Sequence, residues 1–410
     1  MTSHGYRQAA IGVAALVSAG WACLPSAAVA QAPCNPASLQ PAYRSFEALA
    51  DGRATFRLCA PDAHDVLLTS GDLPAMIPDA PTGGLAMSKD ATGLWSTTLP
   101  RPAAPGTYQF SFRVDGVPTP DPMGHSFVRN WRGVGSTFTI EAPAPSRQTW
   151  DPAIPHGASA TIDYWSSALK IARRARIYTP PGYMKGGRSY PVLYLVHGAG
   201  GSEESWSTVG RVNIILDALI AAGTARPMIV VMPDGTTPLR PGVQTMDNPD
   251  FGEDLTRDLI PLIDATYRTL PVPDMRAMAG LSMGGSHTLR NGLTHPDLFH
   301  WIGIFSMGLG QANDPNPDRV GDYTRRYDAA LRQDASQLKL LYYAMGRDDF
   351  LYPTASRTRA MFDRYGLHYV YHESDGGHTW VNWRAYLEDF APRIFREAPH
   401  AVERRQKAAG

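Results

Sequence analysis

Hydrophobic and polar positions follow two different patterns along this chain. Between about residues 46 and 140, short runs of β-branched and aromatic residues, several alternating with polar ones, are separated by turns rich in proline and glycine. Strands of this length and spacing predict an all-β sandwich. The predicted strands are Ala54–Leu58, Val66–Leu68, Leu94–Leu99, Thr107–Val114 and Ser136–Ile140.

From about residue 160 onward, apolar runs alternate with amphipathic helices. The predicted strands are Val192–Val196, Met228–Met232, Arg276–Ala279, Trp301–Phe305, Leu338–Ala344 and His368–His372. The first four are apolar almost throughout, as expected for strands covered on both faces. Helices are predicted over Val212–Ala222 and Phe251–Tyr267. This pattern predicts an α/β domain with a doubly wound, mostly parallel sheet.

The change of pattern divides the 410 residues into five predicted segments. Residues 1–30 form a signal peptide, 31–142 the β-sandwich domain, 143–159 a proline-rich linker, 160–398 the α/β domain, and 399–410 a charged tail. Two folded domains agree with the length, which is large for a single hydrophobic core.

The signal peptide is predicted from three features. Arg7 is the positive residue, Ala9–Trp21 the apolar stretch, and Ala28–Ala30 a small-residue cleavage site. The apolar stretch is short for a bilayer span. We therefore expect a secreted or periplasmic protein, with no membrane contact after cleavage; a lipid anchor on Cys23 is the alternative.

Cleavage would leave Cys34 and Cys59, which an oxidising compartment favours as a disulfide. Two unpaired thiols are the alternative. Neither cysteine has a metal-ligand spacing, and the H-E-x-x-H zinc pattern is absent from the sequence, so we predict no metal and no organic cofactor. Basic and acidic residues number 38 each, so the chain has no net positive charge that would attract nucleic acid or an anionic membrane.

The most informative motif is Gly280–Gly285, with the sequence Gly-Leu-Ser-Met-Gly-Gly. It follows a predicted strand and precedes a predicted helix over Ser286–Leu293. A nucleophile elbow requires this context, because a serine at the apex of a sharp turn needs small neighbours where strand and helix approach each other. Ser282 is therefore the candidate nucleophile.

A serine nucleophile needs a base and an acid that holds the base. His378 lies in a glycine-containing loop just after the last predicted strand, and is the candidate base. The competing histidines His287, His295, His368 and His372 lie in helices, at a helix end or in strands, and are expected to be structural. For the acid, Asp349 is preferred and Asp348 is the alternative, both in a loop after a strand; the second aspartate is expected to cap the next helix.

Two backbone N–H groups should hold the oxyanion. One is expected from Met283, next to the nucleophile, and the other from the loop His197–Gly201 after the first parallel strand. Ala199 is preferred there over Gly198, and His197 is interpreted as a structural hydrogen-bonding residue.

The second domain resembles the esterase D family, which includes feruloyl and acetyl esterases of carbohydrate esterase family 1 and enterochelin esterases. The stretches that carry this resemblance are Arg174–Tyr183, Leu195–Gly201 with Trp206, Pro227–Gly235, Asp254–Arg268, Arg276–Gly285, Gly346–Leu351 and Gly377–Leu387. The resemblance implies the α/β-hydrolase fold, with Ser282 as nucleophile, His378 as base and Asp349, three residues after Gly346, as acid.

The first domain resembles the immunoglobulin-like sandwich found beside such esterases and is similar to family 48 carbohydrate-binding modules. Phe56–Pro61, Trp95 and Pro105–Gly116 carry this resemblance. Trp95 and Trp131 are candidates for stacking on sugar rings, although the place of Trp95 within a strand favours a core role. A domain that docks on the esterase or forms the rim of its cleft is the alternative to a glycan-binding one.

These features predict a secreted serine carboxylesterase that removes ester substituents from plant cell-wall polysaccharide, feruloyl groups first and acetyl groups second. Its partner is then an ester-substituted polysaccharide or oligosaccharide. The alternatives are a siderophore esterase of the enterochelin type, an acyltransferase of the same superfamily, and a non-catalytic glycan-binding protein. Candidate residues bordering the substrate cleft are Trp206, Trp380, Asp247 and Phe251.

Overall fold

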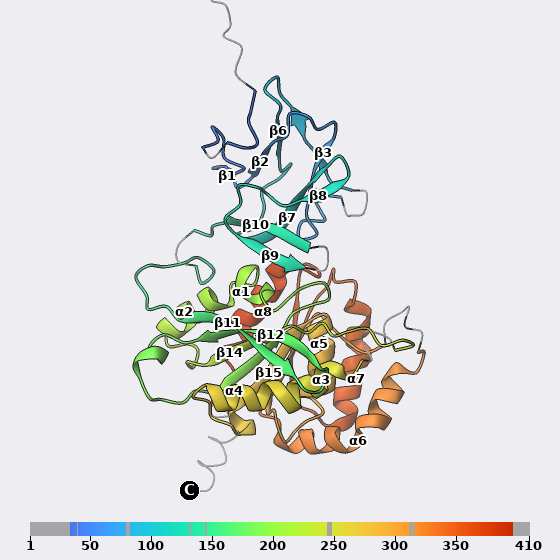
Figure 1. Cartoon of the computed structure of the whole chain (residues 1–410). Helices are drawn as coiled ribbons and strands as arrows, with labels where there is room; N and C mark the ends of the chain where they lie inside the picture. Colours follow the sequence, from blue (N-terminus) through green and yellow to red (C-terminus); the bar gives the residue numbers. More distant parts are fainter. Residues whose placement is uncertain are drawn as a thin grey trace, which may run out of the picture.

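The computed structural model describes residues 33–38, 40–78, 83–130, 133–143, 146–243, 248–310, 314 and 316–396. The predicted signal peptide and charged tail, Trp131 and Asp247 lie outside the described residues. Two bodies are visible, an upper one built of strands and a lower one in which helices surround a large sheet (Figure 1).

The lower body contains an eight-stranded sheet in the order β11-β12-β14-β13-β15-β16-β17-β18. The strands are β11 Ala158–Ser166, β12 Ile171–Thr179, β13 Val192–Val196, β14 Ile229–Pro233, β15 Arg276–Leu281, β16 Trp301–Phe305, β17 Leu340–Gly346 and β18 Tyr369–Ser374. The pairs β11/β12 and β12/β14 are antiparallel, and every other pair is parallel. The predicted, mostly parallel sheet is therefore confirmed, with each predicted strand within two residues of its observed ends.

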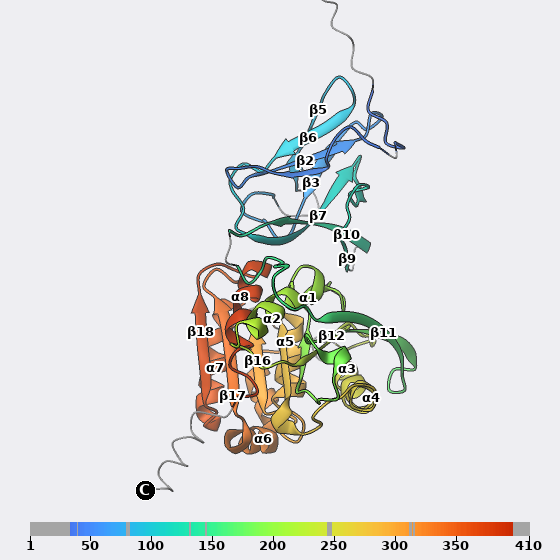
Figure 2. The same cartoon turned by 90° about the vertical axis from the view of Figure 1, so that its left-hand side faces the viewer.

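Helices cover both faces of this sheet (Figure 2). They are α1 Ser205–Thr208, α2 Val212–Ala221, α3 Asp250–Asp254, α4 Ile260–Thr266, α5 Met283–His287, α6 Arg319–Gln337, α7 Ala355–Tyr365 and α8 Trp380–Phe390. Short 3-10 turns lie at Tyr183–Lys185, Pro273–Met275 and Tyr352–Thr354, and π-helical turns at Leu255–Leu259 and Thr288–Gly292.

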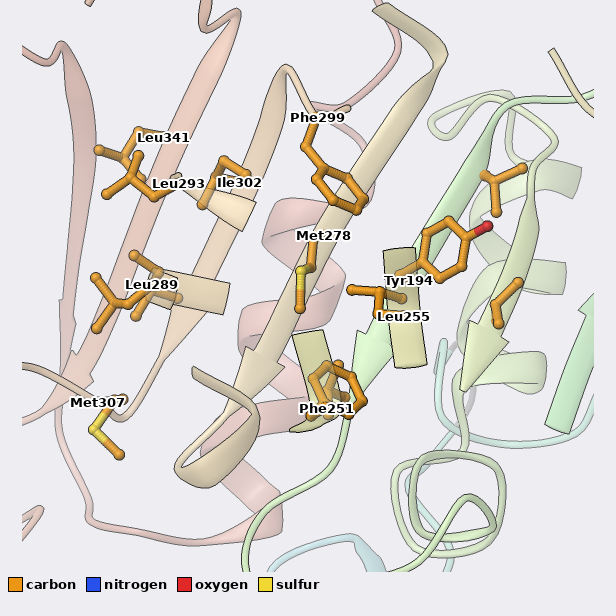
Figure 3. Packing of buried hydrophobic residues seen from close by; sticks show 14 of the residues in the cluster. Tyr194, Phe251, Leu255, Met278, Leu289, Leu293, Phe299, Ile302, Met307 and Leu341 are labelled. Carbon is orange, nitrogen blue, oxygen red and sulfur yellow. The ribbon is translucent and has the colours of Figure 1, made fainter. Parts of the chain in front are cut away.

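The alternation of side chains along β13 explains the two-sided core. Tyr194 packs with Phe251 and Leu255 of the α3–α4 layer in one buried cluster, which Figure 3 shows beside Met278. Its neighbours Leu193 and Leu195 pack in the opposite cluster with α2 and α8. Because successive side chains of a strand point to opposite faces, an apolar run buries all of them only between two helical layers.

The helix predicted over Phe251–Tyr267 forms, but as α3, a π-helical turn and α4. Pro261 explains the interruption, because it has no N–H to donate to the carbonyl of Arg257 four residues earlier. The sequence pattern did not predict β11, β12, α6 or α8.

The upper body, residues 46–140, contains two sheets and is called here the N-terminal β-region. One sheet has the order β1-β2-β6-β5, and the other β4-β3-β7-β10-β9, with β8 paired to β7. The strands are β1 Phe46–Ala48, β2 Ala54–Cys59, β3 Val66–Thr69, β4 Leu85–Ala86, β5 Ser88–Lys89, β6 Leu94–Thr98, β7 Gly106–Val114, β8 Val117–Thr119, β9 Phe127–Asn130 and β10 Gly133–Ile140.

The two sheets of the β-region share one buried cluster that includes Phe56, Phe110 and Phe138. Trp95 lies in this cluster, 7% exposed, and its indole N–H donates to the Ala60 carbonyl at 2.9 Å. Trp95 is therefore a core residue and has no exposed face for a sugar. A disulfide joins Cys34 to Cys59, with a Cα–Cα distance of 5.8 Å, and links the start of the described chain to β2.

A buried arginine joins the two bodies. Arg384 on α8 is fully buried, and its Nη1 donates to the carbonyls of Thr107 in β7 and Val209 after α1, both at 3.0 Å. Its Nε donates to the Gln148 amide oxygen at 2.9 Å, in the segment between the bodies. A Cβ added to Gly106 would lie 2.0 Å from Nη2 of Arg384, so this close approach requires glycine.

Within the part of the chain that the structure describes, no helix is long and apolar enough to cross a bilayer.

Candidate active site

Ser282 occupies the turn between β15 and α5, with φ 52° and ψ −117°. A positive φ is strained for a residue with a side chain, and such strain presents a serine at the apex of an elbow. The turn is possible because a Cβ on Gly280 would lie 2.4 Å from the backbone of Gly284, and one on Gly284 would lie 2.3 Å from the Val196 carbonyl oxygen. The glycines therefore permit the helix to begin at Met283, three residues earlier than predicted.

The structure brings His378 and Asp349 together. Nδ1 of His378 lies 2.9 and 3.0 Å from the two carboxylate oxygens of Asp349. Asp349 is 3% exposed, whereas the His378 side chain is 19% exposed and lines a cavity that Ser282 also lines. Because a carboxylate only accepts, Nδ1 carries the proton and Nε2 is left as an acceptor.

The two aspartates left open by spacing have different surroundings. Asp348 is exposed, whereas Asp349 holds His378 and also accepts the Leu351 N–H at 2.9 Å. We expected one aspartate to hold the histidine and the other to cap the following helix. The structure gives the histidine to Asp349, and neither aspartate caps the helix, because the 3-10 turn Tyr352–Thr354 and α7 both begin without a side-chain cap.

The loop after β13 approaches Ser282 closely, since a Cβ on Gly198 would lie 3.3 Å from Cβ of Ser282. Nε2 of His197 accepts the Gly235 N–H at 2.8 Å, so its Nδ1 carries the proton and donates to the Gly198 carbonyl at 2.7 Å. The Asp234 carboxylate lies 3.3 Å from the same Nε2, which is farther than the Gly235 nitrogen. In a trans peptide the carbonyl and the next N–H point in opposite directions. The N–H of Ala199 therefore points away from the buried His197, and Ala199 lines the cavity.

His287 is a buried histidine outside the candidate site. Burial lowers its pKa to about 3, it stacks on Phe251 with 4.1 Å between ring centroids, and its Nε2 lies 3.0 Å from the Gly235 carbonyl. It is neutral at physiological pH and lies away from the cavity lining.

The cavity over Ser282 has a volume of about 620 Å³ and lies between the two bodies. Its lower wall includes the 198–201 loop, Ser282, His378, Trp380 and Trp383. Its upper wall comes from the N-terminal β-region and includes Asp72, Gln109, Ser111 and Arg113. Burial raises the pKa of Asp72 to about 6, although its carboxylate accepts the Gln109 N–H at 2.7 Å.

Two predicted cleft residues are corrected by the structure. Trp206 is 1% exposed and donates its indole N–H to the Val196 carbonyl at 3.1 Å, while Phe251 is fully buried beneath the sheet. Both lie near catalytic loops in sequence, but their helices turn these side chains into the core. Trp380 does line the cavity, and Asp247 lies outside the described residues.

The sequence analysis allowed for a first domain that forms the rim of the cleft, but it did not identify the residues of the upper wall. The alternation of β7 identifies Gln109, Ser111 and Arg113 as one polar face, but alternation alone does not say what that face lies against. Among the described residues, no group of three or more histidine, cysteine or acidic side chains is arranged to hold a metal ion.

The fold and the position of Ser282 define the α/β-hydrolase class. A family model with the description "Putative esterase" matches residues 166–394, more than half of the chain. The chain therefore belongs to this family of esterases.

Relatives extend the comparison beyond the family match. An endo-1,4-beta-xylanase/feruloyl esterase of Xylanibacter ruminicola is 35% identical over 361 residues, covering 84% of this chain and 45% of that protein. The chain thus spans just under half the length of this relative.

Two solved structures share the fold. A carbohydrate esterase family 1 ferulic acid esterase from Anaeromyces mucronatus, solved with ferulic acid, has a TM-score of 0.52 at 22% identity and covers 62% of this chain and 96% of its own. The enterobactin esterase of Shigella flexneri has a TM-score of 0.58 at 19% identity and covers 85% and 94%. The second match extends over most of both bodies.

Proposed function

We propose that this protein is a secreted serine carboxylesterase that removes ester substituents from plant cell-wall polysaccharide, with feruloyl esters as first substrates and acetyl esters as second. The observation that carries the proposal is the geometry of one cavity. A serine on a strained strand–helix turn and a histidine held by a buried aspartate line the same space. This is the arrangement that activates a hydroxyl for attack on a carbonyl carbon.

In the proposed reaction, Ser282 attacks the ester carbonyl while Nε2 of His378 takes the hydroxyl proton. Asp349 holds the imidazole and stabilises the imidazolium that forms. The negative charge that develops on the carbonyl oxygen is met by the N–H groups of Ala199 and Met283. His378 then gives its proton to the leaving alkoxide. Water repeats the cycle on the acyl-enzyme and releases the acid.

The choice of a polysaccharide ester rests on the relative and on the charge of the cavity. The relative from Xylanibacter ruminicola combines xylanase and feruloyl esterase in one name, which motivates the feruloyl assignment. Apart from His378, the charged side chains among the described lining residues are Arg113 and Asp72, of opposite sign. A nearly neutral cavity favours an uncharged sugar ester over an iron-loaded catecholate siderophore, which carries several negative charges.

The second candidate is a siderophore esterase, favoured by the likeness in fold to the enterobactin esterase across both bodies. For the N-terminal β-region we infer an immunoglobulin-like sandwich similar to family 48 carbohydrate-binding modules. Two antiparallel sheets around a shared aromatic core support this assignment. Export through the predicted signal peptide is also part of the proposal.

The test is a comparison of kcat/KM for methyl ferulate, acetylated xylan and a tri-catecholate siderophore with the same preparation. The proposal expects the highest value with methyl ferulate and no turnover by Ser282→Ala. The matched control is Ser207→Ala, which removes a half-buried hydroxyl of α1 outside the cavity lining. Preference for the siderophore would replace the substrate assignment, and retained turnover in Ser282→Ala would refute the mechanism.

A further inference from the structure

One face of the N-terminal β-region lies against the catalytic cavity instead of open solvent. Along β7, Phe110 and Phe112 are buried in the core between the two sheets, whereas Gln109, Ser111 and Arg113 are half-buried and point to the opposite face. All three of these polar residues line the cavity that contains Ser282. The polar face of β7 thus lies on the opposite side of the cavity from the candidate nucleophile, Ser282.

The neighbouring strands make this face a shallow trough. Thr69 of β3 pairs with Ser111, and the register of β10, with Thr137 opposite Gln109, sets Gly135 on the other side of Ser111. Thr69 and Gly135 both line the cavity. Gly135 adds no side chain at this point, and the Asn130 amide, which also lines the cavity, would lie 3.2 Å from a Cβ placed there. Hydrogen-bonding groups therefore lie on both sides of Ser111.

The two walls of the cavity differ in chemistry. The upper wall presents the polar groups of Ser111, Gln109, Asp72 and Arg113 beside the apolar Pro118 and Val134, whereas the side chains of the lower wall around Ser282 and His378 are the apolar Leu281, Trp380 and Trp383. An aromatic acyl group matches the apolar wall. A sugar matches the polar one, because each of its hydroxyls needs hydrogen-bonding partners when water is displaced.

The position of His378 gives an independent reason to place the alcohol near the upper wall. The leaving alkoxide must lie within reach of His378, which gives it a proton. Helix α8 begins two residues after His378, and it is this helix that binds β7 through Arg384 and the Thr107 carbonyl. The leaving alcohol is therefore expected on the side of the cavity where β7 packs against α8.

We propose that the outer face of β3, β7 and β10 is the subsite for the alcohol part of the ester, a sugar, so that the N-terminal β-region forms part of the catalytic centre. The inference rests on the proposed esterase function and adds to it the residues that select the alcohol. Gln109 and Arg113 bind sugar hydroxyls, and Ser111 lies at the centre of the trough.

The experiment compares two esters with the same acyl group and different alcohols, methyl ferulate and a feruloylated arabinoxylo-oligosaccharide. The measured quantity is the ratio of kcat/KM for the sugar ester to that for the methyl ester. The double variant Gln109→Ala/Arg113→Ala should lower this ratio about tenfold through loss of hydrogen bonds to the sugar. Ser111→Trp, which fills the trough, should lower it further.

The matched control is Arg57→Ala on β2. Arg57 is also a half-buried arginine of the β-region, paired with Glu47, but it belongs to the sheet farther from the esterase body (Figure 2). Its variant should keep the wild-type ratio. Unchanged circular dichroism and urea midpoints confirm that each variant is folded.

The outcomes separate this inference from the proposed function. If the wild type cleaves both esters and neither the double variant nor Ser111→Trp changes the ratio, the alcohol subsite is refuted while the esterase remains. If the wild type cleaves no feruloyl ester but cleaves acetyl esters, the same ratio is measured with methyl acetate and acetylated xylo-oligosaccharide. A wild type that cleaves neither pair refutes the proposed function and this inference together.

Discussion

Arg384→Met should weaken the docking of the two bodies and lower the stability of the whole protein. The side chain is fully buried and donates three hydrogen bonds, to Thr107, Val209 and Gln148. Hydrogen bonds from a charged donor contribute about 1.5–3 kcal/mol each, so their loss removes about 5–9 kcal/mol. Methionine keeps most of the volume, which limits the cost of a cavity.

An opposing effect reduces this cost. Burial lowers the pKa of Arg384 from its usual 12.5 to about 10. At about 1.4 kcal/mol per unit of pKa, this corresponds to a net penalty of about 3 kcal/mol on the buried charge, which the variant no longer carries. The hydrogen bonds outweigh this relief, and the expected net loss in the free energy of unfolding is about 2–6 kcal/mol.

The assay is urea unfolding followed by tryptophan fluorescence, with the midpoint converted to free energy by the linear slope. The control is Arg393→Met, which removes an exposed pair with Asp389 and should cost about 0.5 kcal/mol or less. If Arg384→Met is no less stable than Arg393→Met, the reasoning about the interface is wrong.

Three further predictions concern the proposed catalytic acid, a support of the 198–201 loop and a buried carboxyl. Asp349→Asn should lower kcat for methyl ferulate by roughly 10⁴-fold without unfolding the chain, because the amide no longer holds the required tautomer of His378; a loss below tenfold in steady-state kinetics would contradict this role. Arg129 of β9 pairs with the buried Glu203, which follows that loop. Arg174 also lies 3.4 Å from Glu203, so Arg129→Ala should lower the thermal midpoint by only about two degrees. Adding Glu203→Gln should restore part of this loss, because the neutral amide needs no ionic partner; no restoration would argue against the pair. Burial raises the pKa of Asp334 to about 8, so the folded state keeps a proton that the unfolded chain releases near pH 4. The free energy of unfolding should therefore fall from about pH 4 to about pH 8, and Asp334→Asn should flatten this slope in urea titrations; equal slopes would refute the assignment.

The sequence predicts the inner strands of the esterase sheet well because these strands are buried on both faces. β13, β14 and β16 are apolar and buried from end to end, which gives each of them a strong pattern. β11 is largely exposed, with polar and small residues, and therefore carries little periodic signal. The long helix α6 is also polar over most of its surface, and only a few of its side chains reach the core.

The candidate site also contains some residues that the sequence predicts and others that it does not. The positions of Ser282 on a strand–helix turn and of His378 in a loop beside the cavity are predictable, because an elbow and a glycine-containing loop require particular small residues nearby. The choice of Asp349 over Asp348 depends on which side chain turns inward, and spacing alone left it open. Trp206 and Phe251 show the limit of proximity in sequence, because residues close to a catalytic loop can point into the core. The upper wall depends on docking between two bodies, which no local pattern encodes.

We propose that Ser282 is a nucleophile activated by His378 and Asp349. This proposal is tested most directly by treating the protein with a fluorophosphonate probe and locating the adduct by peptide mass spectrometry. The account predicts stoichiometric labelling on Ser282, with labelling at least a hundredfold slower in a variant with His378→Ala, roughly as expected for loss of a general base. Labelling elsewhere, or an equal rate without the histidine, would contradict it.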